Sequence, residues 1–136
     1  MLELAVALYL STPYAIDGDT IQIGRERVRL VQIDTPEIGT CYAEQARRFT
    51  QRFIEAEGEV KLVKDTRLDN RDTYGRALRY LIKAGRNLNL ELVRKGYAKP
   101  MFYNGVRGKY AAKIEQYARS AKANRLGVWN CKGVSK

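Results

Sequence analysis

The 136-residue sequence contains no histidine. This absence excludes Ser-His-Asp triads, Cys-His catalytic pairs, zinc sites that depend on imidazole, and nucleases that use histidine as a base or metal ligand. Acid–base chemistry in this chain must therefore come from Asp, Glu, Lys, Tyr or Arg side chains, with or without a metal ion.

Long apolar runs are also absent, because no stretch approaches the ~18–20 residues of a membrane-spanning helix. Residues 1–10 are apolar but include Glu3 and lack both a basic region and a clear cleavage site, so they do not resemble an intact signal peptide. We expect them to form a first strand or to be the remnant of a longer leader. Apolar residues make up 45% and charged residues 29% of the chain, which predicts one globular domain over residues 1–136.

Cysteine is scarce, since the chain has only Cys41 and Cys131. Two thiols without histidine are too few for a zinc site. They are either two reduced buried thiols or one disulfide that closes a long loop, and a disulfide would indicate an oxidising compartment.

Acidic residues are scarce in the second half of the chain. Residues 1–68 hold 9 Lys and Arg against 11 Asp and Glu, whereas residues 69–136 hold 16 against 4, and the formal net charge is +10. A basic half favours a polyanionic partner, nucleic acid first and an anionic membrane second. A cationic surface that only keeps the protein soluble would give the same pattern.

The apolar periodicity predicts about five strands and three helices. Alternating apolar and polar residues indicate strands, and a repeat of 3.6 residues indicates helices. Strands are expected at residues 4–10, 20–23, 27–33, 59–64 and 76–82, and helices at about 42–57, 87–95 and 106–125. This order predicts an α+β fold with a mainly β core, namely a five-stranded Greek-key barrel of the oligonucleotide/oligosaccharide-binding (OB) type with three helices.

Three stretches place carboxylates and arginines at expected strand ends. They are Asp17-Gly18-Asp19-Thr20, Arg29-Leu30-Val31-Gln32-Ile33-Asp34-Thr35-Pro36-Glu37, and Asp72-Thr73-Tyr74-Gly75-Arg76. Oxygen ligands such as Asp19 and Asp34 suit Ca²⁺ or Mg²⁺, and two arginines, Arg29 and Arg76, could clamp one phosphate. Glu37 is left to act on a water molecule. The set meets the needs of phosphodiester hydrolysis, which are charge neutralisation, an oriented phosphate and a base.

Each stretch also has a structural interpretation when it is taken singly. Asp17 and Asp19 could serve a hairpin turn, Arg29 could pair with Glu37 for structure alone, and Arg76 could be a solvated charge at a strand start. All of these interpretations must hold at once for the whole pattern to be structural. The combination therefore favours chemistry.

In order and spacing, these stretches resemble the signature of the staphylococcal nuclease (thermonuclease) family. The matching residues are Ile16-Asp17-Gly18-Asp19-Thr20, Arg29 with Asp34-Thr35-Pro36-Glu37, Tyr74-Gly75-Arg76, Leu92-Val93-Arg94-Lys95-Gly96 and Gly127-Val128-Trp129. The resemblance covers nearly the whole chain and implies an OB-fold barrel with three helices. It also implies a Ca²⁺-dependent nuclease that cleaves DNA and RNA, as single strands or frayed duplexes, at the P–O5′ bond and leaves 3′-phosphates.

The resemblance implies a metal site and a base by position. Asp19, Asp34 and the backbone carbonyl of Thr35 are expected to bind Ca²⁺. Glu37 is expected to contact the ion through water and is the proposed general base. Asp17 is expected near the ion without binding it directly.

The resemblance also implies contacts with the substrate. Arg29 and Arg76 are expected to bind the scissile phosphate and to stabilise the charge of the transition state. Tyr74 is expected to support the terminal phosphate or nucleotide. Phe102 and Tyr103 compete for the role of stacking on a nucleobase, and we assign it to Tyr103.

The chain departs from the better-known family members around the site. The loop after Glu37 is short, with Ile38-Gly39-Thr40-Cys41 leading directly into the helix, and Thr73 replaces a lysine. These changes affect substrate affinity and preference rather than the chemistry. Some relatives carry one cysteine in this loop and another near the C-terminus, which favours a disulfide between Cys41 and Cys131 and a secreted or periplasmic location.

A non-catalytic OB module that binds nucleic acid is the alternative function. Family relatives that lost the acidic set behave in this way, whereas the set is complete here. We expect a monomer that does not associate with membranes.

Overall fold

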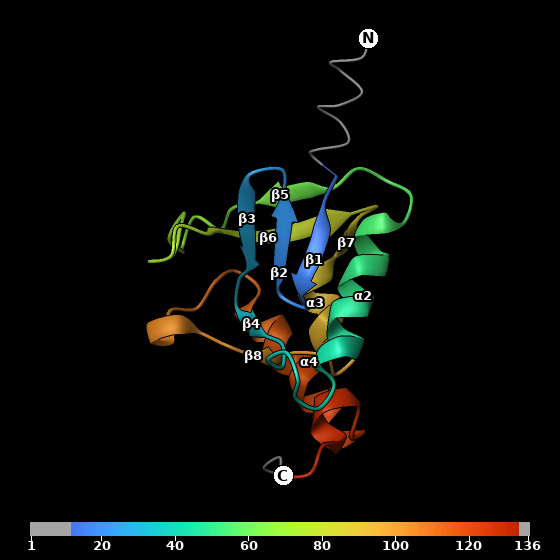
Figure 1. Ribbon diagram of the computed structural model, residues 1–136. Coiled ribbons are helices and arrows are strands. Elements are labelled where there is room, and N and C mark those ends of the chain that lie inside the picture. Colours follow the sequence, from blue (N-terminus) through green and yellow to red (C-terminus); the bar gives the residue numbers. More distant parts are fainter. Residues whose placement is uncertain (1–11, 134–136) are drawn as a thin grey trace.

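Two sheets and three α-helices make up the part of the chain that the computed structural model describes, residues 12–133 (Figure 1). The strands are β1 Tyr14–Asp17, β2 Thr20–Ile23, β3 Glu26–Leu30, β4 Ile33–Asp34, β5 Lys61–Val63, β6 Ala77–Lys83, β7 Arg86–Asn87 and β8 Lys99–Pro100. The helices are α2 Ala43–Glu55, α3 Leu88–Arg94 and α4 Ala111–Ala123, with 3₁₀ turns η1 Tyr103–Gly105 and η2 Gly127–Asn130. The strand expected at residues 4–10 lies outside the described residues. None of the helices in residues 12–133 has the length and apolar character that crossing a membrane requires.

The main sheet has the order β1-β2-β3-β6-β5. β3 pairs with the N-terminal part of β6, and β7 pairs with its C-terminal end, at Ile82 and Lys83. β3 and β6 run parallel, whereas the remaining pairs are antiparallel. The expected α+β class is confirmed. Five strands were expected, whereas the described sheet has six: four of them match expected strands, and β1 and the short strand β7 were not predicted. Within residues 12–133 no ladder joins β1 to β5, so closure into a barrel stays a prediction.

The strand expected at residues 27–33 is interrupted, and this break shapes the site. β3 ends at Leu30, and Gln32 takes a left-handed backbone conformation with φ of 69°. The buried Gln32 side chain accepts a hydrogen bond from the Gly108 N–H at 2.7 Å and donates one to the Val106 carbonyl at 3.1 Å. These contacts with residues distant in sequence end the strand, although the alternation of apolar and polar residues favours its continuation to residue 33. The chain then pairs with β8 as β4, in a second sheet.

The helices begin and end close to the predicted positions, with one exception. The amide oxygen of Asn87 caps α3 by accepting a hydrogen bond from the Leu90 N–H at 3.3 Å. The last helix starts at Ala111 rather than at residue 106. Residues 106–110 form a loop instead, because Gly108 and Lys109 donate their backbone N–H groups to Gln32 and Asp65.

One apolar core lies between the main sheet and the three helices (Figure 1). Its fully buried members include Ile21, Leu30, Leu81, Leu92 and Ile114. Each such side chain contributes about 1.5–3 kcal/mol by leaving water. The core therefore fixes β2, β3 and β6, which are the strands that carry or adjoin the candidate site.

Candidate active site

The turn between β1 and β2 holds Asp19 in place. The Asp17 carboxylate accepts a hydrogen bond from the Asp19 N–H at 3.0 Å, as sequence reasoning for an Asp-Gly-Asp turn suggests. Gly18 lies against the next part of the site, because a Cβ atom built on it would lie 2.7 Å from Thr35 Cγ2 and 2.9 Å from the Ala46 Cβ. Thr50 of α2 donates its hydroxyl to the Gly18 carbonyl at 2.6 Å. The turn is therefore locked against both the β4 segment and α2.

Arg29 lies at the centre of the candidate site. Its Nη2 is 3.3 Å from Asp19 Oδ2 and 3.2 Å from Asp34 Oδ1, and its Nη1 donates to the Leu30 carbonyl and, at 2.9 Å, to the Ile33 carbonyl. The residue is 9% exposed. A buried guanidinium needs this number of partners to offset its loss of hydration. The break in the strand at Gln32 turns the chain so that Asp34 lies against Arg29, five residues earlier.

The acidic groups around Arg29 repel one another. Burial raises the pKa of Asp34, and the charges of Asp19 and Glu37 raise it further, although Arg29 opposes them. Burial and the neighbouring Asp19 raise the pKa of Asp17 to about 6. A single arginine therefore leaves excess negative charge that a cation would relieve.

The donor set fits a hard metal ion in its chemistry. Asp19 Oδ2 also accepts the Thr35 N–H at 2.9 Å, which turns the Thr35 segment toward the two carboxylates. The Thr35 hydroxyl is buried and has no hydrogen-bond partner within residues 12–133. No group of three or more Asp, Glu, Cys or His side chains gathers closely enough in this part of the chain to hold an ion unaided. An ion here would therefore rely on backbone oxygen and water as well as two carboxylates.

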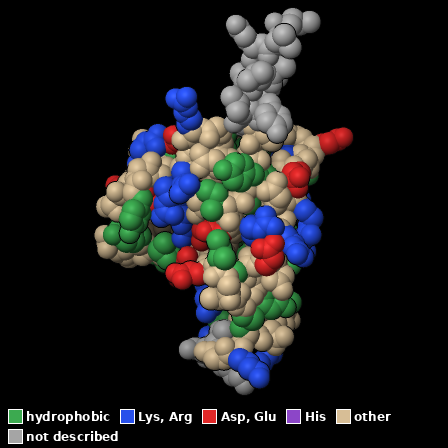
Figure 2. Space-filling model, viewed as in Figure 1, with side chains coloured by type: hydrophobic (Ala, Val, Ile, Leu, Met, Phe, Trp, Pro, Cys, Tyr) green, Lys and Arg blue, Asp and Glu red, His purple; other side chains and the backbone are tan. Residues whose placement is uncertain are grey.

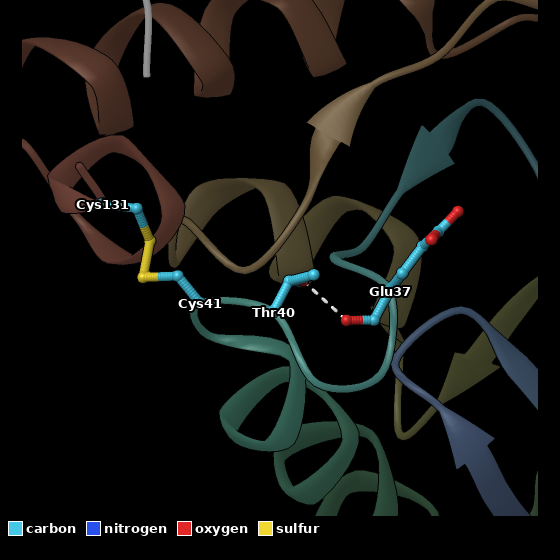
Figure 3. The surroundings of a disulfide bond; sticks show 4 residues. All are labelled: Glu37, Thr40, Cys41 and Cys131. Carbon is cyan, nitrogen blue, oxygen red and sulfur yellow. Dashed lines mark hydrogen bonds between the residues drawn. A yellow bond between two sulfur atoms is a disulfide. The ribbon is translucent and has the colours of Figure 1, made fainter. Parts of the chain in front are cut away.

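Glu37 lies on an exposed loop that is tied down on its C-terminal side. Its carbonyl accepts hydrogen bonds from the Thr40 hydroxyl at 2.6 Å and from the Thr40 N–H at 3.0 Å. Cys41, which follows Thr40, forms a disulfide with Cys131, with 6.1 Å between the Cα atoms. The expected bridge is confirmed. In Figure 3 the Glu37 carboxylate points away from this bridge, and it has no ion-pair partner within residues 12–133.

Arg76 is held by Asp72 rather than by the Arg29 cluster. The Asp72 carboxylate accepts the Tyr74 and Arg76 N–H groups at 3.0 and 2.9 Å, and Arg76 Nε lies 2.7 Å from Asp72 Oδ2. Burial opposes ionisation of Asp72, but the hydrogen bonds from Arg76 outweigh it and hold the pKa of Asp72 below its ordinary value. Arg29 pairs with Leu78 in the parallel β3–β6 ladder, and Arg76 lies two residues before Leu78, directly before β6 begins. Sequence reasoning assigned no role to Asp72, although an Asp two residues before Tyr74 is a recognisable turn signal.

The two candidate tyrosines differ in their relation to the site. Tyr74 is 83% exposed, and the Arg76 guanidinium lies 5.4 Å from the centre of its ring. Tyr103 is 68% exposed in η1, which follows β8. No hydrogen bond or ring contact in the described part of the chain joins Tyr103 to the other candidate residues. The structure thus brings Tyr74 to Arg76 and leaves the role of Tyr103 as a prediction.

Comparison with known proteins identifies similar chains. A family model described as staphylococcal nuclease homologue matches residues 27–131. The chain is 35% identical over 124 residues to a thermonuclease of Staphylococcus intermedius, which covers 84% of this chain and 71% of the relative. It is 30% identical over 125 residues to a thermonuclease of Staphylococcus hyicus, covering 85% and 72%. It is 30% identical over 129 residues to endonuclease YncB of Bacillus subtilis, covering 88% of this chain but only 60% of the relative.

Proposed function

Because this chain belongs to the staphylococcal nuclease family, we propose that it is a Ca²⁺-dependent nuclease that hydrolyses DNA and RNA. The names of its relatives, thermonuclease and endonuclease, support nuclease activity. The proposed cleavage is at the P–O5′ bond, leaves 3′-phosphates, and acts on single strands or frayed duplexes. The observation that carries the proposal is the buried Arg29 of β3, held between Asp19 and Asp34, while Arg76 directly precedes the neighbouring strand β6.

The proposed metal ligands are the Asp19 and Asp34 carboxylates and the Thr35 carbonyl. Glu37 would contact the ion through water. The mutual repulsion of the carboxylates and the oxygen-only donor set support Ca²⁺. When bound, the ion would neutralise charge on a non-bridging phosphate oxygen.

The protein side chains supply the rest of the proposed mechanism. Arg29 and Arg76 donate hydrogen bonds to the other phosphate oxygens and stabilise the added charge of the transition state. Glu37 accepts a proton from the water that attacks phosphorus. Its exposure and its lack of an ion-pair partner within the described residues keep the carboxylate available for this role. Tyr74 and Tyr103 are proposed to contact the bound nucleotide.

Further parts of the proposal concern the whole protein. We propose that residues 1–136 form one domain, that the sheet forms an OB-type barrel, and that the chain acts as a monomer. The disulfide supports a secreted or periplasmic location, since such bridges persist in oxidising compartments.

Cleavage of end-labelled single-stranded DNA and RNA tests the proposal. The reactions contain Ca²⁺, Mg²⁺ or a chelator, and the product ends are analysed with a 3′-phosphatase. We expect cleavage with Ca²⁺, loss of cleavage with chelator, and 3′-phosphate ends. Binding without cleavage under every condition would overturn the proposal in favour of the nucleic-acid-binding module.

A further inference from the structure

A cleft of about 600 Å³ opens beside Arg76, outside the Asp19–Arg29–Asp34 cluster. Its walls come from the β2–β3 hairpin and from the turn before β6. The lining includes Gln22, Arg25, Glu26, Arg27, Tyr74 and Arg76. In Figure 2, Lys and Arg side chains gather over β3 beside a group of Asp and Glu side chains.

Strand register connects this cleft to the candidate site. Val28 pairs with Ala77 in the parallel β3–β6 ladder, so Arg27 of β3 and Arg76, directly before β6, each precede a paired residue, and both line the cleft. Residues two apart on a strand face the same side, so Arg27 and Arg29 share a face at a repeat of about 6.6 Å. The three arginines thus form a continuous row from the site into the cleft.

Two of the arginines that line the cleft, Arg25 and Arg27, have little compensating charge, whereas Arg76 is paired with Asp72. The Glu26 carboxylate is paired with Arg71, at 2.6 Å, rather than with its sequence neighbours. Within residues 12–133 the Arg27 guanidinium forms one hydrogen bond, from Nε to the Gln22 amide oxygen at 3.3 Å. Neither Arg25 nor Arg27 forms an ion pair anywhere in residues 12–133. Both are exposed, so their guanidinium groups can reach an anion that enters the cleft.

We propose that Arg25 and Arg27 form a second phosphate subsite for the substrate strand, with the Gln22 amide oxygen orienting Arg27. This subsite holds the phosphate next to the one bound by Arg29 and Arg76. The inference rests on the proposed function and deepens it, because it predicts that the enzyme prefers strands over single nucleotide esters. A strand is the favoured ligand because the arginine row is continuous with the catalytic cluster and is open at its far end.

A double variant tests the subsite, with a control of equal charge. Arg25→Ala/Arg27→Ala removes two positive charges from the cleft. Arg119→Ala/Lys122→Ala removes two from the exposed side of α4, at the opposite end of the molecule from the β2–β3 turn (Figure 1). Arg25→Lys/Arg27→Lys keeps the charge and should recover part of any loss. Circular dichroism verifies that all variants are folded.

The first readout is the kcat/KM ratio for two substrates. One is a single-stranded hexanucleotide, and the other is a nitrophenyl ester of a mononucleotide, which has no second internucleotide phosphate. We expect the cleft variant to lose at least 10-fold more kcat/KM on the hexanucleotide than on the ester, chiefly through KM. An equal loss on both substrates, no loss, or the same loss in the α4 variant would overturn the subsite.

The second readout is binding without turnover, which separates this inference from the proposed function. Fluorescence anisotropy measures the affinity for a labelled oligonucleotide in chelator over a range of salt concentrations. The slope of log affinity against log salt should fall by about 0.7 for each phosphate contact that the cleft variant loses. Competition of inorganic phosphate with the labelled oligonucleotide distinguishes a strand subsite from a site for free anions. A strand subsite requires phosphate to bind more weakly than the oligonucleotide. An unchanged slope, or equal binding of phosphate, would overturn the inference even in a protein that cleaves nothing.

Discussion

Cys41 forms a disulfide with Cys131, which lies 90 residues further along the chain. The residue before Cys41, Thr40, donates its hydroxyl to the Glu37 carbonyl. The bridge therefore ties the loop of the proposed base to the segment after η2 (Figure 3). The loop has few other anchors, because residues 37–41 are all exposed.

Removing the bridge should destabilise the fold. We expect Cys41→Ser/Cys131→Ser to lower the free energy of unfolding by roughly 2–5 kcal/mol, because the unfolded chain loses a long covalent loop. Urea unfolding followed by tryptophan fluorescence measures this difference. A reducing agent should produce the same loss in the wild type and no further change in the variant. Equal stability of wild type and variant would contradict the prediction.

Replacing Glu37 with Gln should separate catalysis from folding. Loss of the base is expected to lower kcat by about 10²–10⁴-fold. The melting temperature should stay within about 2 °C, because a surface change away from packed groups alters stability by about 0.5 kcal/mol or less. Steady-state kinetics and thermal melts check the two parts. Glu59→Gln, an exposed control, should leave both unchanged, and a wild-type rate in Glu37→Gln would remove Glu37 from its role.

Local signals in the sequence predicted much of the fold and of the site. The Asp-Gly-Asp turn, the Asn87 cap and the apolar stripe of α2 each depend on neighbours in sequence. The break at Gln32 could not be predicted, since its partners are the backbone groups of residues 106 and 108. That break decides where Asp34 lies. The carboxylate pattern and the family resemblance both made Asp34 a candidate, but only the tertiary contacts explain its approach to Arg29.

Gly18→Ala should disturb the site through packing alone. Its new Cβ would lie within 3 Å of both Thr35 and Ala46, so either the β1–β2 turn or the β4 segment must move. We expect a loss of about 1–3 kcal/mol in the free energy of unfolding, as for other overpacked sites. Urea unfolding measures this loss. Gly96 offers a comparison: a Cβ there would lie 2.5 Å from the Leu126 carbonyl oxygen, where the chain after α3 meets the chain after α4. Only Gly18→Ala should also weaken Ca²⁺ binding measured by calorimetry, and wild-type stability and affinity would contradict the packing argument.

Asp65 should make the fold sensitive to acid. Burial opposes its ionisation, but the Tyr80 hydroxyl at 2.6 Å and the N–H groups of Lys109 and Arg67 donate to its carboxylate and hold its pKa below the ordinary value. The folded protein therefore binds this proton less tightly than the unfolded chain does. The stabilisation is complete above the unfolded pKa of about 3.9 and is lost as the pH falls through the lower folded value.

The Asp65→Asn variant isolates this contribution. The wild type should lose more unfolding free energy than the variant between about pH 5 and pH 3, because only the wild type has the carboxylate to protonate. Urea unfolding at several pH values measures the difference, with the exposed Asp69→Asn as the control. If the unfolding free energies of wild type and Asp65→Asn fall in parallel with pH, the charge of Asp65 does not stabilise the contact between the loop before α4 and the sheet. A steeper loss of stability in the wild type would assign this acid sensitivity to the Asp65 carboxylate. The same carboxylate accepts the Lys109 N–H, the contact that holds residues 106–110 as a loop, so that α4 begins at Ala111.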